Sequence, residues 1–223
     1  MLALGVLISG RGTNLQAIID AIEDGRLDAD IELVLSNTAS AHGLERAAAA
    51  GIATTVVDHK SFAGREPFDA AMVDALKTAG VEWVVLAGFM RIVTPVFLNA
   101  FPQRVINMHP ALCPSFAGID AQAQALDYGV RVTGCTVHLV DQGVDTGPIL
   151  SQAVVPVRQD DNRDTLAARL LMREHELLTT TLQWIAEGRL TTEPVAGAGG
   201  DRLRVLLRGV DPLLFGSWGE PNA

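Results

Sequence analysis

Three polar side chains in the second half of the chain have the types that proton transfer needs. Asn107 and His109 stand two residues apart at the end of an apolar run, so in a strand both would point to the same side. An imidazole placed there can transfer a proton near neutral pH, and Asn107 can donate a hydrogen bond to a developing oxyanion. Asp145, in the glycine-rich loop 141–147, would orient His109 and stabilise its imidazolium form if it reached the ring. The alternative is a structural histidine beside an acidic surface turn.

A glycine-rich segment near the start of the chain has the composition of an anion site. Residues 9–14 read Ser-Gly-Arg-Gly-Thr-Asn and lie where a first strand would end and a helix would begin. Unpaired N–H groups and the dipole at a helix N-terminus favour a phosphate. The segment is neither a Walker A loop, since no Gly-Lys-Ser/Thr follows, nor a dinucleotide fingerprint, since Leu15 replaces the third glycine. The alternative is a tight turn capped by Thr13 or Asn14. The residues of the expected cradle are Arg11, Gly12, Thr13 and Asn14.

Three further charged residues stand where a ligand could meet them. Leucines recur at four-residue steps along an expected helix over residues 164–187, and Glu174 interrupts this ridge. A carboxylate among core leucines needs a partner, so Glu174 either reaches the edge of a pocket or forms a structural ion pair. Arg91 follows an apolar strand, where it would bind a carboxylate or carbonyl of a ligand or would simply be solvated. Arg65, in a loop before a helix, has a weaker case of the same kind.

No metal centre and no disulfide framework are expected. A zinc site built from Cys113, His109, His138 and Asp145 is conceivable, but the spacings match no common zinc pattern. The only other cysteine is Cys135, and the pair forms no Cys-x-x-Cys motif. This usage is typical of a reducing compartment.

Alternating strands and helices must position these side chains. Short apolar runs predict parallel strands that are covered on both faces. The expected strands are residues 2–8, 31–35, 53–57, 81–86 and 105–108, and the expected helices between them are residues 14–23, 42–50 and 67–79. This alternation predicts an α/β fold, a Rossmann-like open and mostly parallel sheet with helices on both faces. Ligands of such sheets bind at the carboxyl ends of the strands, where the candidate residues stand.

The second half of the chain is less regular. A short helix, two strands and a long helix are expected at residues 120–128, 132–140, 149–157 and 164–187. At roughly 150 residues per domain, a chain of 223 residues favours one domain with an appendage. We therefore expect a catalytic domain over residues 1–190 and a C-terminal appendage over residues 191–223, formed by a hairpin and a loose tail.

Composition limits the partners. The chain has 17 Lys and Arg against 26 Asp and Glu, a net charge of −9, and 48% hydrophobic residues. Such a chain is globular, and its charge disfavours nucleic acid and anionic membranes as partners, although small anions remain suitable. The apolar run 83–90 is too short for a membrane span, and no basic residue precedes the apolar N-terminal run, which is expected to be a buried strand rather than a signal peptide. The expected location is the cytoplasm.

Taken in order along the chain, these segments resemble the folate-dependent formyltransferases of the glycinamide ribonucleotide formyltransferase family. The matching stretches are Leu7–Ile19, Val84–Arg91, Ile106–Pro110 and Gly134–Gly147. The resemblance implies transfer of a formyl group from 10-formyltetrahydrofolate, as cosubstrate, to the amine of 5-phosphoribosylglycinamide in purine synthesis. It implies small-molecule partners and no metal, and it leaves a monomer and a homodimer open.

The resemblance also implies roles for individual positions. Asn107, His109 and Asp145 look like the catalytic residues. Positions that look like contacts of phosphoribosylglycinamide are Arg11, Gly12, Thr13, Asn14, Leu171, Met172, Arg173 and Glu174. Positions that look like contacts of the folate are Arg65, Met90, Arg91, Ile92, Val93, Asn107, Val140, Asp141 and Asp145. Ser115 and Ala117 depart from the Lys and Pro of some members, so no contact is inferred for that loop.

Four other functions are alternatives to the one that this resemblance implies. Methionyl-tRNA formyltransferase is similar but carries a further C-terminal domain and must hold RNA, which disagrees with the net charge of −9. Formyltetrahydrofolate hydrolase, which passes the formyl group to water, has an added N-terminal regulatory domain. A non-catalytic nucleotide-binding module would not need Asn107, His109 and Asp145. A dinucleotide-dependent dehydrogenase is disfavoured by Leu15 and by Asn37, which stands where an acidic residue would bind the ribose.

Overall fold

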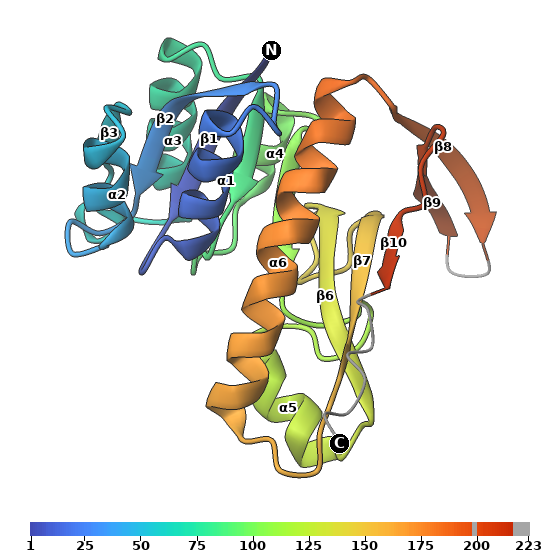
Figure 1. Ribbon diagram of the computed structural model, residues 1–223. Helices are drawn as coiled ribbons and strands as arrows, with labels where there is room; N and C mark the ends of the chain where they lie inside the picture. Colours follow the sequence, from blue (N-terminus) through green and yellow to red (C-terminus); the bar gives the residue numbers. More distant parts are fainter. Residues whose placement is uncertain (198–199, 216–223) are drawn as a thin grey trace.

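An eight-stranded sheet forms the framework of the protein (Figure 1), in a computed structural model that describes residues 1–197 and 200–215. The strand order is β10-β7-β6-β5-β4-β1-β2-β3. The strands are β1 (Leu2–Ile8), β2 (Ala29–Ser36), β3 (Thr54–Val56), β4 (Trp83–Leu86), β5 (Val105–His109), β6 (Val132–Leu139), β7 (Ile149–Pro156) and β10 (Leu213–Phe215). β6 runs antiparallel to β5 and β7, and the other neighbouring pairs are parallel. The predicted open, mostly parallel α/β sheet is confirmed.

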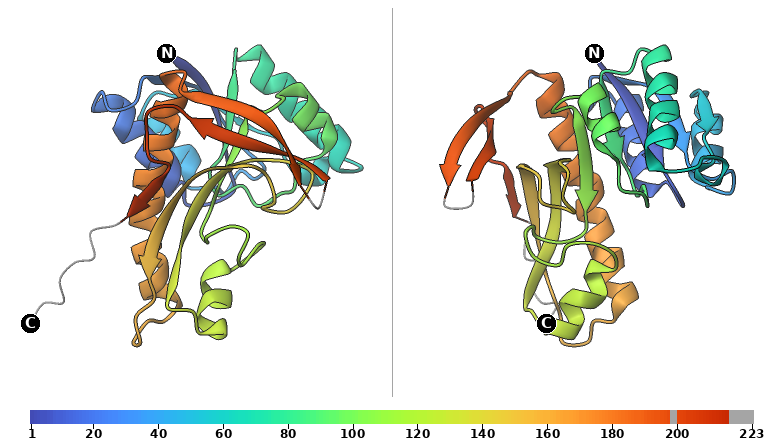
Figure 2. Two further views of the ribbon diagram at one scale, coloured as in Figure 1. Left: turned by 90° about the vertical axis from the view of Figure 1, so that its right-hand side faces the viewer. Right: turned by 180° about the vertical axis from the view of Figure 1, so that it is seen from behind.

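Helices cover both faces of this sheet. In β1, Leu4, Val6 and Ile8 belong to a core shared with α1, α2 and α6, whereas Leu7 belongs to a second core shared with α3 and α4. The view from behind in Figure 2 shows α3 and α4 in front of the sheet, where Figure 1 shows α1 and α6. The helices are α1 (Thr13–Glu23), α2 (Gly43–Ala49), α3 (Arg65–Thr78), α4 (Pro95–Ala100), α5 (Ala121–Tyr128), α6 (Arg163–Ala186) and a 3₁₀ turn, η1 (His59–Ser61). Among the helices of the described residues, none combines the length and the apolar run that crossing a bilayer requires.

The long helix α6 starts at a reciprocal cap. The Asn162 side chain accepts hydrogen bonds from the N–H groups of Asp164 and Thr165, and the Thr165 hydroxyl accepts one from the Asn162 N–H. Leucines at four-residue steps then face the core, as the sequence predicted. These buried residues are Leu166, Leu170, Leu178 and Leu182. α6 packs along α1 and along the β6–β7 pair, which places residue 174 beside the first turn of α1.

The order in which strands are added to the sheet reverses between β1 and β4, which run parallel. The chain runs from β1 through β2 to β3 at one edge and returns with β4 on the other side of β1. A crevice at the carboxyl ends of two such strands is the usual ligand site of an open α/β sheet. Here the Ser9 N–H donates to the Gly88 carbonyl at 3.2 Å, and the Ser9 hydroxyl accepts from the Met90 N–H at 2.8 Å. The glycine-rich loop and the segment after β4 are therefore joined at this crevice.

Three elements, α3, α4 and β10, differ from the sequence prediction. α3 begins at Arg65, so Arg65 lies in the first turn of a helix rather than in a loop. The six-residue α4 and the three-residue β10 were not predicted, because such short elements carry too few residues for a periodic pattern. In the appendage, β8 (Leu190–Gly197) and β9 (Gly200–Leu207) form an antiparallel pair outside the main sheet, while β10 joins β7. Residues 198–199 and 216–223, on which the expected loose tail also falls, lie outside the described residues.

Candidate active site

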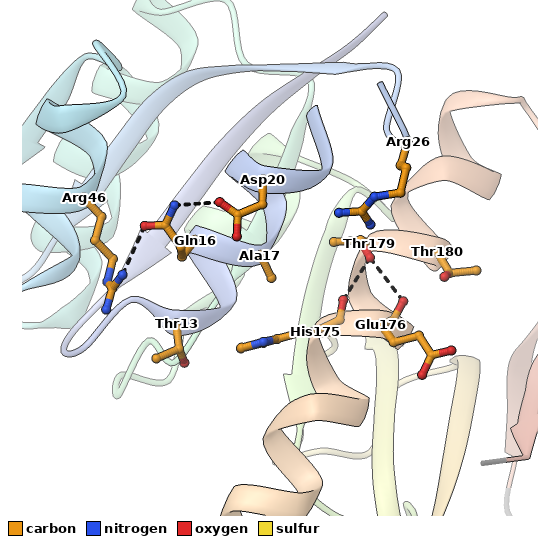
Figure 3. A pocket seen from close by; sticks show the side chains of 10 residues that line it. All are labelled: Thr13, Gln16, Ala17, Asp20, Arg26, Arg46, His175, Glu176, Thr179 and Thr180. Atoms are coloured by element: carbon orange, nitrogen blue, oxygen red, sulfur yellow. Dashed lines mark hydrogen bonds between the residues drawn. The ribbon is translucent and has the colours of Figure 1, made fainter. Parts of the chain in front are cut away.

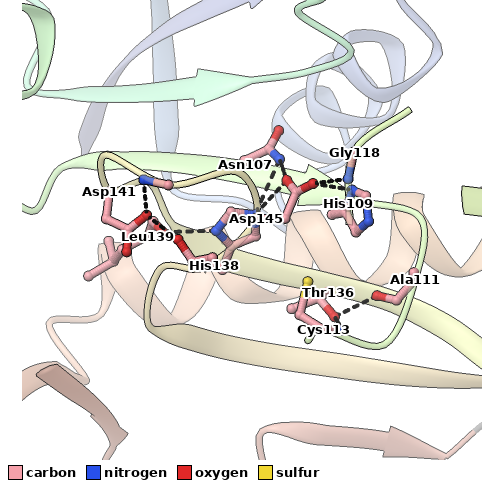
Figure 4. Close-up of polar contacts among 12 residues, drawn as sticks. Asn107, His109, Ala111, Cys113, Gly118, Thr136, His138, Leu139, Asp141 and Asp145 are labelled. Atoms are coloured by element: carbon pink, nitrogen blue, oxygen red, sulfur yellow. Dashed lines mark hydrogen bonds and ion pairs between the residues drawn. The ribbon is translucent and has the colours of Figure 1, made fainter. Parts of the chain in front are cut away.

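Asn107, His109 and Asp145 meet at the carboxyl end of β5 (Figure 4). One carboxylate oxygen of Asp145, Oδ2, lies 3.3 Å from His109 Nδ1, and the other, Oδ1, accepts a hydrogen bond from Asn107 Nδ2 at 3.2 Å. The side chains of His109 and Asp145 are only 5% and 10% exposed. The structure thus brings together, on one side of the strand, three groups that the chain separates by 38 residues.

Both nitrogens of the His109 ring face hydrogen-bond acceptors. Nε2 lies 2.9 Å from the carbonyl oxygen of Phe116, and Nδ1 faces the carboxylate of Asp145. Both oxygens only accept hydrogen bonds, so each ring nitrogen can bond its partner only when it carries a proton. The ring is therefore oriented by a backbone carbonyl on one side and a carboxylate on the other.

A second histidine completes the cluster. His138 is buried, and its Nδ1 donates to the Leu139 carbonyl at 2.8 Å. When the ring is neutral, Nε2 is left to accept from Asn107 Nδ2, 3.2 Å away. The two N–H groups of Asn107 thus face His138 and Asp145, so donation to a ligand requires one of these contacts to open. The sequence indicated His138 only as a conceivable zinc ligand, and its contact with Asn107 was missed. The position of His138 opposite Asn107 depends on the antiparallel register of β5 and β6.

Asp145 is held as a carboxylate. Burial alone raises the pKa of Asp145, but contacts with His138, the Gly118 N–H at 2.8 Å and the charge of His109 together lower it further than burial raises it. The net pKa lies below the ordinary value of an aspartate, so the group is ionised at neutral pH. Its backbone is left-handed, with φ of 54°, a conformation that Asp and Asn tolerate better than most residues. The described residues contain no group of three or more metal-ligating side chains arranged around a common point.

The glycine-rich loop presents open N–H groups at the start of α1. Gly12 is the N-cap residue, with φ of 68°, and its position carries no side-chain cap. The capped turn that the sequence left open is therefore not formed. The first α-helical hydrogen bond runs from the Gln16 N–H to the Gly12 carbonyl, which leaves the N–H groups of the first turn for an anion.

Asn14 and Glu174 form a buried pair beside this loop. Asn14 Nδ2 donates to Glu174 Oε2 at 3.1 Å, and the two residues are 9% and 8% exposed. The partner of Glu174 is thus a neutral amide and not the cation of a structural ion pair. Burial raises the pKa of Glu174, and the hydrogen bond from Asn14 offsets part of that rise. Asn14 Oδ1 has no hydrogen-bond partner within the described chain, so acceptors with unmet capacity stand next to the glycine-rich loop.

Replacing Glu174 with glutamine is expected to raise the melting temperature at neutral pH. Because burial raises the pKa of Glu174, its ionised form costs stability at neutral pH, and this cost disappears as the pH falls below the ordinary pKa of a glutamate. The gain should therefore shrink on acidification, as followed by thermal unfolding. Glu176→Gln, at an exposed position on the same helix, is the control and should leave the melting temperature nearly unchanged. A Glu174→Gln protein that melts lower than the parent at neutral pH would contradict this account.

The other residues predicted to contact phosphoribosylglycinamide are less buried than Glu174. Leu171 is half-buried and Met172 is 67% exposed. Arg173 forms an ion pair with Glu176 at 2.6 Å, on the surface of α6. Arg11 is exposed within the glycine-rich loop. In this structure, the buried groups facing the loop are Asn14 and Glu174.

The residues predicted to contact the folate include a segment after β4 and the first residue of α3. Met90 and Ile92 are exposed by 70% and 53%, whereas Val93 is buried. Arg65 and Arg91 are exposed, and their charges both act on the buried Asp69: burial raises the pKa of Asp69, and the two arginines lower it in part. Apolar side chains and cations are thus available at the end of β4 and the start of α3.

The loop after β6 supplies the remaining predicted folate residues. Val140 is half-buried and packs against the core beneath α3 and α4. The Asp141 carboxylate accepts hydrogen bonds from the Gly143 N–H and the Thr146 hydroxyl, at 2.9 and 2.7 Å. Asp141 therefore shapes the loop that carries Asp145.

A cavity of about 430 Å³ opens between α1 and α6, beside Thr13 (Figure 3). Asn107, His109 and Asp145 do not line this cavity. The cavity instead extends from the glycine-rich loop along α1. Its lining residues are Thr13, Gln16, Ala17, Asp20, Arg26, Arg46, His175, Glu176, Thr179 and Thr180.

The open α/β sheet thus carries a glycine-rich loop after β1 and a His–Asp pair at the carboxyl end of β5, the edge at which such sheets bind ligands. Comparison with known proteins identifies the family. Residues 3–182 match the formyl transferase family model. The chain therefore belongs to the formyl transferase family.

Individual relatives agree with this family. Phosphoribosylglycinamide formyltransferase of Escherichia coli (strain K12) is 42% identical over 199 residues, which cover 89% of this chain and 94% of that protein. The trifunctional purine biosynthetic protein adenosine-3 of Drosophila pseudoobscura pseudoobscura is 49% identical over 189 residues, but the chain spans only 14% of its length. The crystal structure of glycinamide ribonucleotide transformylase 1 from Symbiobacterium toebii superposes with a TM-score of 0.87 at 46% identity and covers 93% of this chain and 94% of that one.

Proposed function

We propose that this protein transfers the formyl group of 10-formyltetrahydrofolate to the amine of 5-phosphoribosylglycinamide, a step of purine biosynthesis. The observation that carries the proposal is the contact of His109 with Asp145, next to Asn107, at the carboxyl end of β5. The proposal is supported by the similarity to the Escherichia coli phosphoribosylglycinamide formyltransferase, which extends over 94% of that protein. The proposed partners are small molecules, with no nucleic acid, membrane or metal; the proposed location is the cytoplasm, and a monomer and a homodimer remain open.

In the proposed reaction, the amine nitrogen attacks the formyl carbon and forms the new C–N bond. The carbonyl electron pair moves to oxygen, and the resulting oxyanion is stabilised by N–H groups of Asn107 and of protonated His109. Each side chain releases one of its present contacts to do so: Asn107 the contact with His138 or Asp145, and His109 the contact with the Phe116 carbonyl. When the oxyanion collapses, the bond between the formyl carbon and the folate nitrogen breaks. His109 delivers a proton to the departing nitrogen and recovers one from the attacking amine, so no net proton is consumed. Asp145 keeps the ring oriented throughout, because its carboxylate faces Nδ1.

The proposed binding mode uses the two sides of the β1–β4 crevice. The phosphate of the ribonucleotide lies against the open N–H groups at Gly12 to Asn14. Ribose hydroxyls or the amine donate to Asn14 Oδ1 and Glu174, which have acceptor capacity to spare. The remaining residues proposed to contact this substrate are Arg11, Leu171, Met172 and Arg173. In this binding mode the phosphate lies at the loop after β1, and His109 and Asp145 lie at the carboxyl end of β5.

The folate is proposed to lie along the segment after β4 and the loop after β6. The exposed side chains of Met90 and Ile92 suit the faces of its ring system, and Arg65 and Arg91 suit carboxylates at its other end. These residue types fit an elongated acid with a flat ring system at its head. The remaining residues proposed to contact it are Val93, Asn107, Val140, Asp141 and Asp145.

A direct assay tests the proposed function. Purified protein given both substrates is expected to form formylated ribonucleotide and tetrahydrofolate in equal amounts, as measured by folate absorbance and mass spectrometry. Without the ribonucleotide, no formate should be released. Formate release under that condition would instead identify a hydrolase, and the absence of any turnover with both substrates would refute the assignment.

A further inference from the structure

The glycine-rich segment 9–14, which is proposed to bind the phosphate, is called the anion loop. Its carbonyl groups are held by the neighbouring helix α2. The Gly43 N–H at the start of α2 donates to the Gly10 carbonyl at 3.0 Å, and Arg46 Nε donates to the Arg11 carbonyl at 2.9 Å. Because the peptide unit is planar and trans, fixing a carbonyl also fixes the direction of the next N–H group, on the opposite side. The bonds from α2 therefore turn the N–H groups of Arg11 and Gly12 away from α2.

The loop and α2 also lie in direct backbone contact. A Cβ atom added to Gly12 would lie 2.5 Å from Gly43 Cα, and one added to Gly43 would lie 2.5 Å from Ile8 Cδ1. No side chain fits between the two segments, so the loop cannot shift toward α2. The start of α2 is a rigid support for the loop backbone.

Arg46 joins this support to α1. Besides its bond to the Arg11 carbonyl, its Nη1 donates to Gln16 Oε1 at 3.1 Å, and Gln16 Nε2 donates in turn to Asp20 Oδ1 at 2.8 Å. Figure 3 shows this chain of contacts along the wall of the cavity beside Thr13. The planar guanidinium thus bonds the backbone of the loop through Nε and a side chain of α1 through Nη1, two nitrogens in a fixed geometry, whereas a lysine offers a single nitrogen on a flexible stem.

We propose that Arg46 is a positioning residue for the phosphate of the ribonucleotide: it orients the loop N–H groups from behind, through the Arg11 carbonyl and Gln16, without touching the reacting atoms. The inference rests on the proposed function in that the phosphate is taken to lie against the loop. Arg46 would then determine the preference for a phosphorylated over an unphosphorylated glycinamide riboside. It would have no part in formyl transfer itself.

Binding of ribose 5-phosphate to the purified full chain, measured by isothermal titration calorimetry, tests the proposal. Arg46→Ala is expected to weaken binding by about tenfold or more, the loss expected for one hydrogen bond from a charged donor. Arg46→Lys should lose most of the same affinity, because it keeps the charge and loses the fork. Arg26→Ala is the matched control: Arg26 lines the same cavity but is paired with Asp24 at 2.9 Å, on the surface. In turnover, Arg46→Ala should raise KM for the phosphorylated substrate and leave kcat and KM for the folate unchanged.

Several results would overturn the proposal. These are wild-type protein that does not bind ribose 5-phosphate, equal affinities of the Arg46→Ala and Arg26→Ala proteins, and wild-type affinity in Arg46→Lys, which would reduce the role to charge. A fall of kcat in parallel with the rise of KM would indicate general damage and would also overturn it. The proposed function fails separately: a wild-type protein that binds ribose 5-phosphate through Arg46 but transfers no formyl group would refute the function and support the role of Arg46.

Discussion

Replacing His109 with alanine is expected to lower kcat by about 100-fold or more, the usual contribution of a positioned acid–base group. The variant removes the ring that is bonded to Asp145 and to the Phe116 carbonyl, and with it the proposed proton donor to the departing nitrogen. Steady-state rates at saturating concentrations of both substrates measure this effect. KM for each substrate should change much less, because the phosphate and folate contacts lie elsewhere.

His42→Ala provides the matched control for this variant. His42 lies at the start of α2, and its side chain is 75% exposed. This control should retain wild-type turnover, and the melting temperatures of both variants should show that they are folded. Wild-type activity in His109→Ala would refute the proposed mechanism.

Replacing Asp145 with asparagine is expected to lower kcat by about 100-fold to 10,000-fold, the range for loss of a group that sets the protonation of a general acid. The two side chains have the same shape, and both tolerate the left-handed backbone at this position. The change therefore removes the charge beside His109 without new backbone strain. It also directs an amide at the N–H groups of Asn107 or Gly118, where the carboxylate accepted two hydrogen bonds.

The same variant has a signature in stability against pH. The folded state lowers the pKa of Asp145, so its ionised form stabilises the fold above the ordinary pKa of an aspartate, and this contribution is lost as the pH falls through the lowered value. Asp145→Asn should thus melt below the parent at neutral pH, with a difference that shrinks in acid. If His109 and Asp145 act as one unit, the double variant should be hardly slower than the slower single variant. Fully multiplicative effects on kcat would contradict that coupling.

The sequence predicted the elements whose pattern repeats over several residues. β1, β2, β4 and β5 each span four residues or more, so their apolar runs could be recognised. The leucine ridge of α6 identified Glu174 as an exception before its partner was known. Asn107 and His109 were recognised because their two-residue spacing in a strand fixes their common direction. These features depend on local geometry alone.

The features that were missed depend on pairing between distant segments. The contact of His138 with Asn107 follows from the antiparallel register of β5 and β6, and no spacing along the chain encodes that register. The support of the anion loop by Arg46 requires α2 to lie against α1. Arg46 and Gln16, which bond each other there, are 30 residues apart in the sequence. The partner of Glu174 is likewise a distant residue: Asn14, an amide and not a cation, lies 160 residues away in the sequence.

The length of α6 has a consequence for how the protein opens. At one end, Leu166 and Leu170 pack in a small core with α5, and near the other, Leu178 and Leu182 pack in the large core with α1 and β1. A single helix of 24 residues thus passes through both cores. Partial opening of either end would pull on the other, so both regions belong to one cooperative unit. A protease that cuts only transiently unfolded chain should therefore cut the middle of α6 only when both of these cores open.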